Sequence, residues 1–198
     1  MIHPLVPYAI RGAIWYQGES NGNEGETYYH KMHGLVKGWR KVWNQGDFPF
    51  YWVQLANFTN DRKTPQGGDG YARIREAERR ALDIPNSGMA VIIDIGETSD
   101  IHPKNKQDVG KRLAQWALAE TYEFDVVASG PLYETMKIEG GKARILFKNV
   151  GKGLIIGRKQ GLEDTEELVI DAKLERFAIA GKDKTWVWAE AVIDGDTV

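Results

Sequence analysis

Asp100 and His102, separated by one residue, are the pair in this chain best suited to acid–base chemistry. They follow an apolar run at residues 89–94 that is typical of a buried strand, and Pro103 after them suits the first turn of a helix. A histidine on such a loop can take a proton from a hydroxyl group, and a nearby carboxylate can fix the orientation of its ring. A structural role, such as capping the helix, is the alternative.

A second polar cluster follows the apolar run at residues 10–16. Polar side chains at the end of a buried strand are costly to hold unless they form hydrogen bonds. The amide groups of Gln17 and Asn21 can donate hydrogen bonds to a developing oxyanion. Glu19 only accepts hydrogen bonds when it is ionised, so we expect it to anchor the loop.

The same cluster contains the segment Gly18-Glu-Ser20-Asn-Gly22, which matches the Gly-x-Ser-x-Gly pattern of a nucleophile elbow. In an elbow a helix begins directly after the serine. Here the five residues Asn, Gly, Asn, Glu and Gly intervene before any helical period begins. Ser20 is therefore a weak candidate for a nucleophile.

Two further histidines, His30 and His33, are three residues apart in a segment with helical period, as at one edge of a metal site. No third ligand stands at a matching spacing, so we expect a solvated helix face and no metal. The chain has no cysteine, which excludes disulfides, thiolate nucleophiles and cysteine-bound metals.

The pattern of apolar residues predicts the elements that position these side chains. Strands are expected at residues 10–16, 49–56 and 89–94. Helices are expected at residues 27–44, 71–83 and 104–121. The alternation of strand and helix predicts a parallel sheet covered by helices, in which ligands bind at the carboxyl ends of the strands. The polar segments that follow the three strands should therefore meet at one edge of the sheet.

The pattern changes near residue 125, where glycines separate short alternating apolar runs. We expect a partial α/β/α catalytic domain at residues 1–124, followed by an incomplete antiparallel β segment at residues 125–198. Both ends of the chain resemble strands that start or stop abruptly, which indicates a fragment of a longer protein.

Composition narrows the choice of partners. The chain has 198 residues and a net charge of −2 without a basic block, which argues against nucleic acid or an anionic membrane. It contains neither a signal peptide nor an apolar run of the ~20 residues that a membrane span needs. The absence of cysteine leaves the compartment open, since many periplasmic and secreted proteins lack it. The sequence does not give the oligomeric state.

Several motifs follow one another in the first two thirds of the chain. They are Gly12-Ala-Ile-Trp-Tyr-Gln-Gly-Glu-Ser-Asn21, Arg75-Glu-Ala77, the segment from Gly88-Met-Ala-Val91 to Asp94-Ile-Gly96, Asp100-Ile-His-Pro-Lys-Asn-Lys106, Gly110-x-Arg112-Leu-Ala114 and Ser129-Gly-Pro131. With these motifs the chain resembles the sialate O-acetylesterase family, a branch of the SGNH hydrolases. The resemblance extends over most of residues 10–131.

The resemblance implies a flavodoxin-like three-layer α/β/α domain that removes acetyl groups from sugars by a Ser-His-Asp mechanism. It implies no metal or organic cofactor, and an acetylated sugar such as O-acetyl sialic acid or an acetylated glycan as the partner. The resemblance implies that His102 is the general base, that Asp100 orients it, and that Gln17 is the side-chain donor of the oxyanion hole. The residues that shape the adjoining loop are Gly18, Glu19 and Asn21.

The nucleophilic serine of the family belongs to a Gly-Gln-Ser-Asn motif near the start of its catalytic domain, and this chain has no such motif. We therefore expect the nucleophile to lie in a missing N-terminal part of the same enzyme, and this chain to be inactive alone. Glu78 also stands where the resemblance leads us to expect glutamine. A full-length parent outside the cytoplasm, in the periplasm or secreted, is compatible with these observations.

Two other functions remain open. One is a non-catalytic carbohydrate-binding fragment in which Trp52, Trp186 and Trp188 stack on sugars, although alternating tryptophans on a strand more often pack in a core. The other is a self-sufficient hydrolase that uses Ser20 as its nucleophile.

Overall fold

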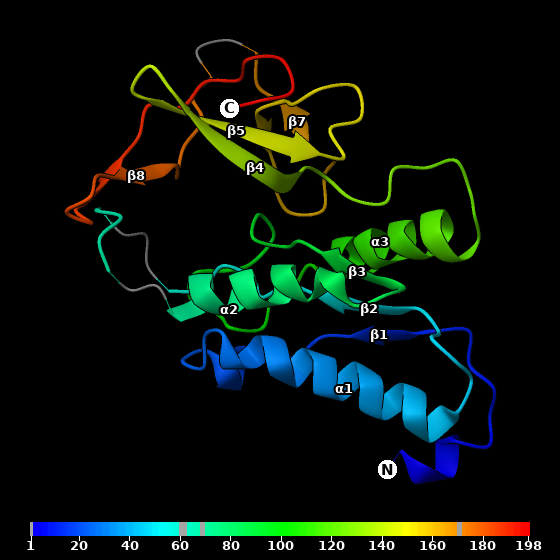
Figure 1. Ribbon diagram of the computed structural model, residues 1–198. Helices are drawn as coiled ribbons and strands as arrows, with labels where there is room; N and C mark the ends of the chain where they lie inside the picture. Colours follow the sequence, from blue (N-terminus) through cyan, green and yellow to red (C-terminus); the bar gives the residue numbers. More distant parts are fainter. Residues whose placement is uncertain (1, 60–62, 68–69, 170–171) are drawn as a thin grey trace. The chain divides into compact units, whose positions relative to one another are not determined.

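The computed structural model describes residues 2–59, 63–67, 70–169 and 172–198 and divides the chain into two compact units. The first unit consists of Met1–Phe58 and Asp69–Ala128, and the second of Thr59–Gly68 and Ser129–Val198 (Figure 1). Within the described ranges, no helix has the length and apolar character needed to cross a membrane.

A parallel three-stranded sheet forms the centre of the first unit. Its strands are β1 (Ala13–Trp15), β2 (Phe50–Val53) and β3 (Ser87–Ala90), in the order β1-β2-β3. Tyr51 pairs with Ile14 on one side and with Gly88 on the other. The parallel direction is expected, because α1 (Thr27–Trp43) and α2 (Gly70–Arg80) connect consecutive strands.

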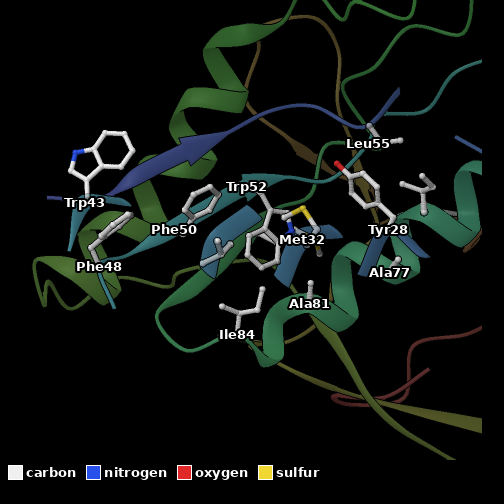
Figure 2. Close-up of a cluster of buried hydrophobic side chains, with 13 residues drawn as sticks. Tyr28, Met32, Trp43, Phe48, Phe50, Trp52, Leu55, Ala77, Ala81 and Ile84 are labelled. Atoms are coloured by element: carbon white, nitrogen blue, oxygen red, sulfur yellow. The ribbon is translucent and has the colours of Figure 1, made fainter. Parts of the chain in front are cut away.

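The two faces of the sheet carry different helices. Side chains alternate along β2, so Phe50 and Trp52 lie in a cluster with residues of α1 and α2, as Figure 2 shows. Tyr51 and Val53 point to the opposite face and pack with residues of α3 (Lys106–Trp116). Two helices on one face and one on the other give three layers, and the predicted α/β/α class with its parallel sheet is confirmed.

Helix α1 buries one face and ends with a left-handed residue. Tyr28, Met32 and Val36 recur every four residues and are all buried. Asn44 then adopts φ 53° and its N–H bonds to the carbonyl of Arg40, which closes the last turn.

Several element ends differ from the predicted ones. Strand β3 stops at Ala90 instead of residue 94, and α3 begins at Lys106 instead of residue 104. Pro103 is therefore not in the first helical turn, because Asn105 caps α3 by accepting a hydrogen bond from the N–H of Asp108. The remaining short helical elements are the 3-10 helices His3–Leu5, Glu19–Asn21 and Ala81–Asp83 and the π-helical turn Ala117–Thr121.

Strand β3 and helix α3 approach each other closely at Gly88. A Cβ atom there would lie 2.4 Å from the ring of Trp116, and the Nε1 of Trp116 donates to the carbonyl of Met89 at 2.9 Å. Glycine is thus required at this position by space, because any larger side chain meets the indole.

Gly88→Ala is expected to lower the free energy of unfolding by about 1–3 kcal/mol, the usual cost of overpacking a dense core. Gly110→Ala is the matched control, since Gly110 lies on an exposed turn of α3 with nothing within 4 Å of an added Cβ. That change should stabilise by up to about 1 kcal/mol through helix propensity. Urea unfolding measures both, and equal effects of the two changes would contradict the packing argument.

The second unit is built of antiparallel strand pairs, as predicted for the β segment. Strands β4 (Leu132–Glu139) and β5 (Lys142–Lys148) form a hairpin whose turn residues, Gly140 and Gly141, both have positive φ. The shorter pairs are β6 (Gly157–Arg158) with β7 (Glu166–Glu167), and β8 (Ala178–Ala180) with β9 (Trp186–Trp188).

The tryptophans differ in burial. Trp52 on β2 is buried, whereas Trp186 and Trp188 on β9 are 46% and 41% exposed. The expectation that alternating tryptophans pack in a core is therefore correct for Trp52 and wrong for the two on β9. Among the described residues of the second unit, Leu132 is the one apolar residue that is buried, with 7% of its surface exposed.

Candidate active site

The loop that carries Asp100 and His102 is anchored at its start by a bidentate ion pair. The guanidinium of Arg112, on α3, donates to both carboxylate oxygens of Asp94 at 2.5 and 2.7 Å, and also to the carbonyl of Val91. Paired hydrogen bonds of this kind fix geometry as well as adding energy. The hydrogen bonds to Asp94 raise the pKa of Arg112, so the clamp stays charged.

Glu97 closes the same loop at its far end. Its Oε1 accepts the backbone N–H of Lys104 at 3.1 Å, and its Oε2 lies 3.2 Å from the Nζ of that lysine. Its carbonyl accepts the N–H of Asp100 at 3.3 Å. This role of Glu97 was not predicted, since a bond across seven residues of loop leaves no periodic signal in the sequence.

Asp100 and His102 face each other within this braced loop. The Oδ1 of Asp100 accepts the backbone N–H of His102 at 2.8 Å and lies 3.5 Å from its Nδ1. The bond from the His102 N–H is the main cause that lowers the pKa of Asp100, which keeps the carboxyl ionised. A distance of 3.5 Å exceeds that of a well-formed hydrogen bond, but catalytic contacts are often long without substrate.

The imidazole of His102 is open to its surroundings, with 86% of its side chain exposed. With Nδ1 toward Asp100, its Nε2 is on the other side of the ring and available to a substrate or a second side chain. The described residues provide no hydroxyl hydrogen-bonded to it.

The other loop follows β1 and is a chain of amide and carboxylate groups. The Nε2 of Gln17 donates to the Oδ1 of Asn21 at 2.9 Å, and the Nδ2 of Asn21 donates to the Oε1 of Glu24 at 2.8 Å. Because an amide nitrogen carries two hydrogens, Gln17 retains one N–H to donate to a ligand. Glu19 begins the 3-10 helix Glu19–Asn21 that connects these groups.

Tyr28 of α1 holds this loop through its hydroxyl group, which contacts Gln17. Its hydroxyl donates to the carbonyl of Gln17 at 2.8 Å and lies 3.3 Å from the Oε1 of the same residue. Burial, followed by the charge of Glu78, raises the pKa of Tyr28, so the hydroxyl remains a neutral donor.

Gly18 is confined on three sides. A Cβ atom at this position would lie 3.1 Å from Leu55, 3.1 Å from the hydroxyl of Tyr28 and 3.4 Å from the Oε1 of Glu78. Its φ of 154° also lies in a region that side chains disfavour. The turn after β1 can therefore be made by glycine alone, and it sets the direction of Gln17.

Ser20 does not lie in an elbow. It is exposed on the 3-10 helix Glu19–Asn21, and the next α-helix begins only at Thr27. In the described part of the chain it has no hydrogen bond to His102. The geometry thus disfavours Ser20 as a nucleophile.

The two loops belong to the same edge of the sheet. The Nζ of Lys106, at the start of α3, lies 4.5 Å from the ring centroid of Tyr16, which follows β1. The segments that follow β2 and β3 also meet, because a Cβ atom on Gly96 would lie 2.2 Å from the Oδ1 of Asn57. The polar segments after the three strands thus converge, as parallel strands require.

The two histidines of α1 make their contacts with residues outside the two loops. The Nε2 of His33 lies 2.9 Å from the Oδ1 of Asp83, and His30 stacks edge-on against Tyr29. Across the described ranges, no three His, Asp or Glu side chains gather as a metal site would require.

A cavity of about 680 Å³ lies at the opposite end of the strands. It is lined by the C-terminal half of α1 and by the segments before β2 and β3, including Arg40, Asp47 and Pro85. None of the candidate site residues lines it, so it does not compete with the loops for the assignment of the site.

The sequence matches a known family over more than half its length. The family described as "Carbohydrate esterase, sialic acid-specific acetylesterase" matches residues 3–119. The chain belongs to this acetylesterase family. The match includes both loops of the candidate site, residues 17–21 and 94–105.

Curated acetylesterases and a solved structure agree with this assignment. The sialate O-acetylesterases of Homo sapiens and Mus musculus are 33% and 32% identical over 157 residues, which is 70% of this chain but 29% and 28% of those proteins. The crystal structure of a carbohydrate acetylesterase from Xanthomonas citri is 38% identical with a TM-score of 0.84, covering 100% of this chain and 43% of that one. The chain therefore spans less than a third of the length of the curated acetylesterases that it matches.

Proposed function

We propose that this chain is part of a carbohydrate O-acetylesterase in which His102 is the general base and Asp100 orients it. The observation that carries the proposal is the exposed imidazole of His102, held beside an ionised Asp100 on a loop that is braced at both ends. The names of the relatives support acetyl esters on sugars, sialic acid among them, as the substrate class.

The geometry suits acyl transfer to a serine. His102 takes the proton of the serine hydroxyl, whose oxygen forms a bond to the acetyl carbon, and Asp100 supports the resulting positive charge on the ring. The free N–H of Gln17 donates to the oxyanion of the tetrahedral intermediate. The ring then returns the proton to the departing sugar oxygen, and water releases acetate in the same way.

The serine itself is proposed to come from a part of the enzyme outside these 198 residues. The chain has four serines, Ser20, Ser87, Ser99 and Ser129. Ser87 begins β3 at the wrong end of the sheet and donates to the carbonyl of Ile84, while Ser129 donates to that of Gly130. Ser99 precedes Asp100 on one loop, and Ser20 is not in an elbow.

The outer edge of β1 is where a further strand of the enzyme would fit. Among the described strands β1 pairs with β2 alone, and its central residue, Ile14, is 69% exposed. Exposed apolar edge strands are normally covered or paired. A strand added there parallel to β1, as the other strands of the sheet are, would place its carboxyl end beside the loop of Gln17.

We expect the isolated chain to hydrolyse an aryl acetate no faster than background, and the full-length protein to hydrolyse it readily. Hydrolysis by the isolated chain that is lost in Ser20→Ala would overturn the assignment of the nucleophile. Sugar binding by the full-length protein without any turnover would instead favour the carbohydrate-binding function, for which the exposed Trp186 and Trp188 are the supporting observation.

A further inference from the structure

Helix α2 carries a carboxyl group that the proposed chemistry does not use. The side chain of Glu78 is 1% exposed, and its Oε2 accepts the backbone N–H of Leu55 at 3.0 Å. Within the described residues it has no ion-pair partner inside 4 Å. Burial is the main cause that raises the pKa of Glu78 to about 8, so the protonated form predominates at pH 7.

The second oxygen of this carboxyl points at the loop of Gln17. The Oε1 of Glu78 and the hydroxyl of Tyr28 lie 3.4 and 3.1 Å from the point where Gly18 would carry a Cβ atom. Glu78 of α2 and Tyr28 of α1 therefore pack side by side against the Gln17–Gly18 turn. A negative charge on this carboxyl would therefore lie directly beside the turn.

The charged groups around Glu78 come from each element packed against it. Glu19, next to Gly18 on the turn, repels the ionised form, and Arg75 on α2 attracts it. The two phenols nearby, Tyr16 and Tyr28, have raised pKa values and stay neutral over the working range of pH. Ionised Glu78 would thus meet an opposing charge on its own helix and a like charge on the turn it supports.

We propose that Glu78 is a positioning residue that works as a neutral acid, holding the Gln17–Gly18 turn when protonated and releasing it when ionised. This inference rests on the proposed function, because the turn carries the oxyanion donor. The ionised carboxyl is costly to hold in this buried position, where it is removed from solvent, and it repels Glu19. Activity is therefore switched off as the pH rises through the pKa of Glu78.

Ionisation of Glu78 at high pH is expected to lower the stability of the folded chain as well as its activity. The pKa of Glu78 is raised above its ordinary value of 4.5, so the folded chain holds this proton more tightly than the unfolded chain. The stability contribution is complete below pH 4.5, declines as the pH rises from there to about 8, and is lost above that.

The first measurement needs no activity and no variant. Carboxyl ¹³C NMR of the 198-residue chain labelled at glutamate should show one folded-state signal with a midpoint near pH 8. Glu78→Gln should remove it, since the amide keeps an acceptor for Leu55 but cannot titrate. Glu76→Gln should leave it, because Glu76 is exposed on the same helix and pairs with Arg79. Titration of every glutamate below about pH 5.5 overturns the proposal.

The second measurement is the pH dependence of kcat/KM in the full-length enzyme. Wild type should lose activity above pH 8, and Glu78→Gln should keep it, so the ratio of variant to wild type rises about 10-fold or more between pH 7 and pH 9.5. An identical alkaline decline in both proteins overturns the proposal. Failure to hydrolyse any acetyl ester would instead refute the proposed function, while the NMR titration would still decide the state of Glu78.

Discussion

Replacing His102 with alanine is expected to lower kcat/KM of the full-length enzyme for an acetyl ester by about 10⁴- to 10⁶-fold. Without the imidazole the loop lacks an effective base for the serine proton, because the lowered pKa of Asp100, caused mainly by the bond from the backbone N–H of residue 102, makes its carboxylate a weak base. The oxyanion donors and substrate binding remain and give the residual rate. Since the ring is 86% exposed, stability should hardly change.

The measurement is steady-state hydrolysis of an aryl acetate and of an O-acetylated sugar, with thermal unfolding as a check on folding. His30→Ala is the matched control, as an exposed histidine of α1 outside the loops. Asp100→Asn should cost nearly as much as His102→Ala, because the amide no longer supports the charged ring. A loss of less than 10-fold in His102→Ala would contradict the role of general base.

The strands themselves could be read from the sequence, but the end of β3 could not. The apolar run continues to residue 94, and a local pattern cannot show where pairing stops. In the structure Gln54 still bonds to the carbonyl of Ala90, whereas the N–H of Leu55 is taken by the carboxyl of Glu78. Because successive N–H groups of a strand point to opposite neighbours, this contact with Glu78 lies on the β1 side of β2, and it joins residues that are 23 positions apart.

For the candidate site, the rule that polar loops meet at the carboxyl ends of parallel strands placed both loops from sequence alone. The side chains that hold these loops were not predictable in the same way. Glu97 and Arg112 act through bonds to residues seven and 18 positions away, and Tyr28 acts across 11. Periodicity records which face of a helix is apolar, but not which polar side chain reaches a given loop.

The β9 tryptophans show a related limit. Alternation along a strand places Trp186 and Trp188 on one face, but it does not say whether that face is covered. The structure leaves both exposed, with Arg176 5.8 Å from the ring of Trp188. A face of this composition can bind a sugar or another part of the enzyme, and the sequence is compatible with both.

Gln17→Ala is expected to lower kcat by about 10²- to 10³-fold with little change in KM, because one oxyanion donor is worth about 3–4 kcal/mol in the transition state and little in the ground state. Gln17→Glu should lose at least as much. Its carboxylate keeps the shape of the side chain, but replaces the donor with a negative charge beside the developing oxyanion.

Asn21→Ala tests how Gln17 is aimed. Its Oδ1 accepts one N–H of Gln17, which directs the other, so its removal should cost about 10-fold in kcat. In the double variant with Gln17→Ala the second change should add almost nothing, since Asn21 acts through a side chain that is no longer there.

Gln45→Ala is the control for these variants. Gln45 exchanges two hydrogen bonds with the backbone of Ile10, at the amino end of β1 and away from the loops. It should lower stability slightly and leave kcat unchanged.

If Gln17→Ala raises KM and leaves kcat intact, the side chain binds the ground state, and the oxyanion must then be stabilised by backbone N–H groups. Full additivity of Gln17→Ala and Asn21→Ala would show that the two amides work independently, which the 2.9 Å bond between them argues against.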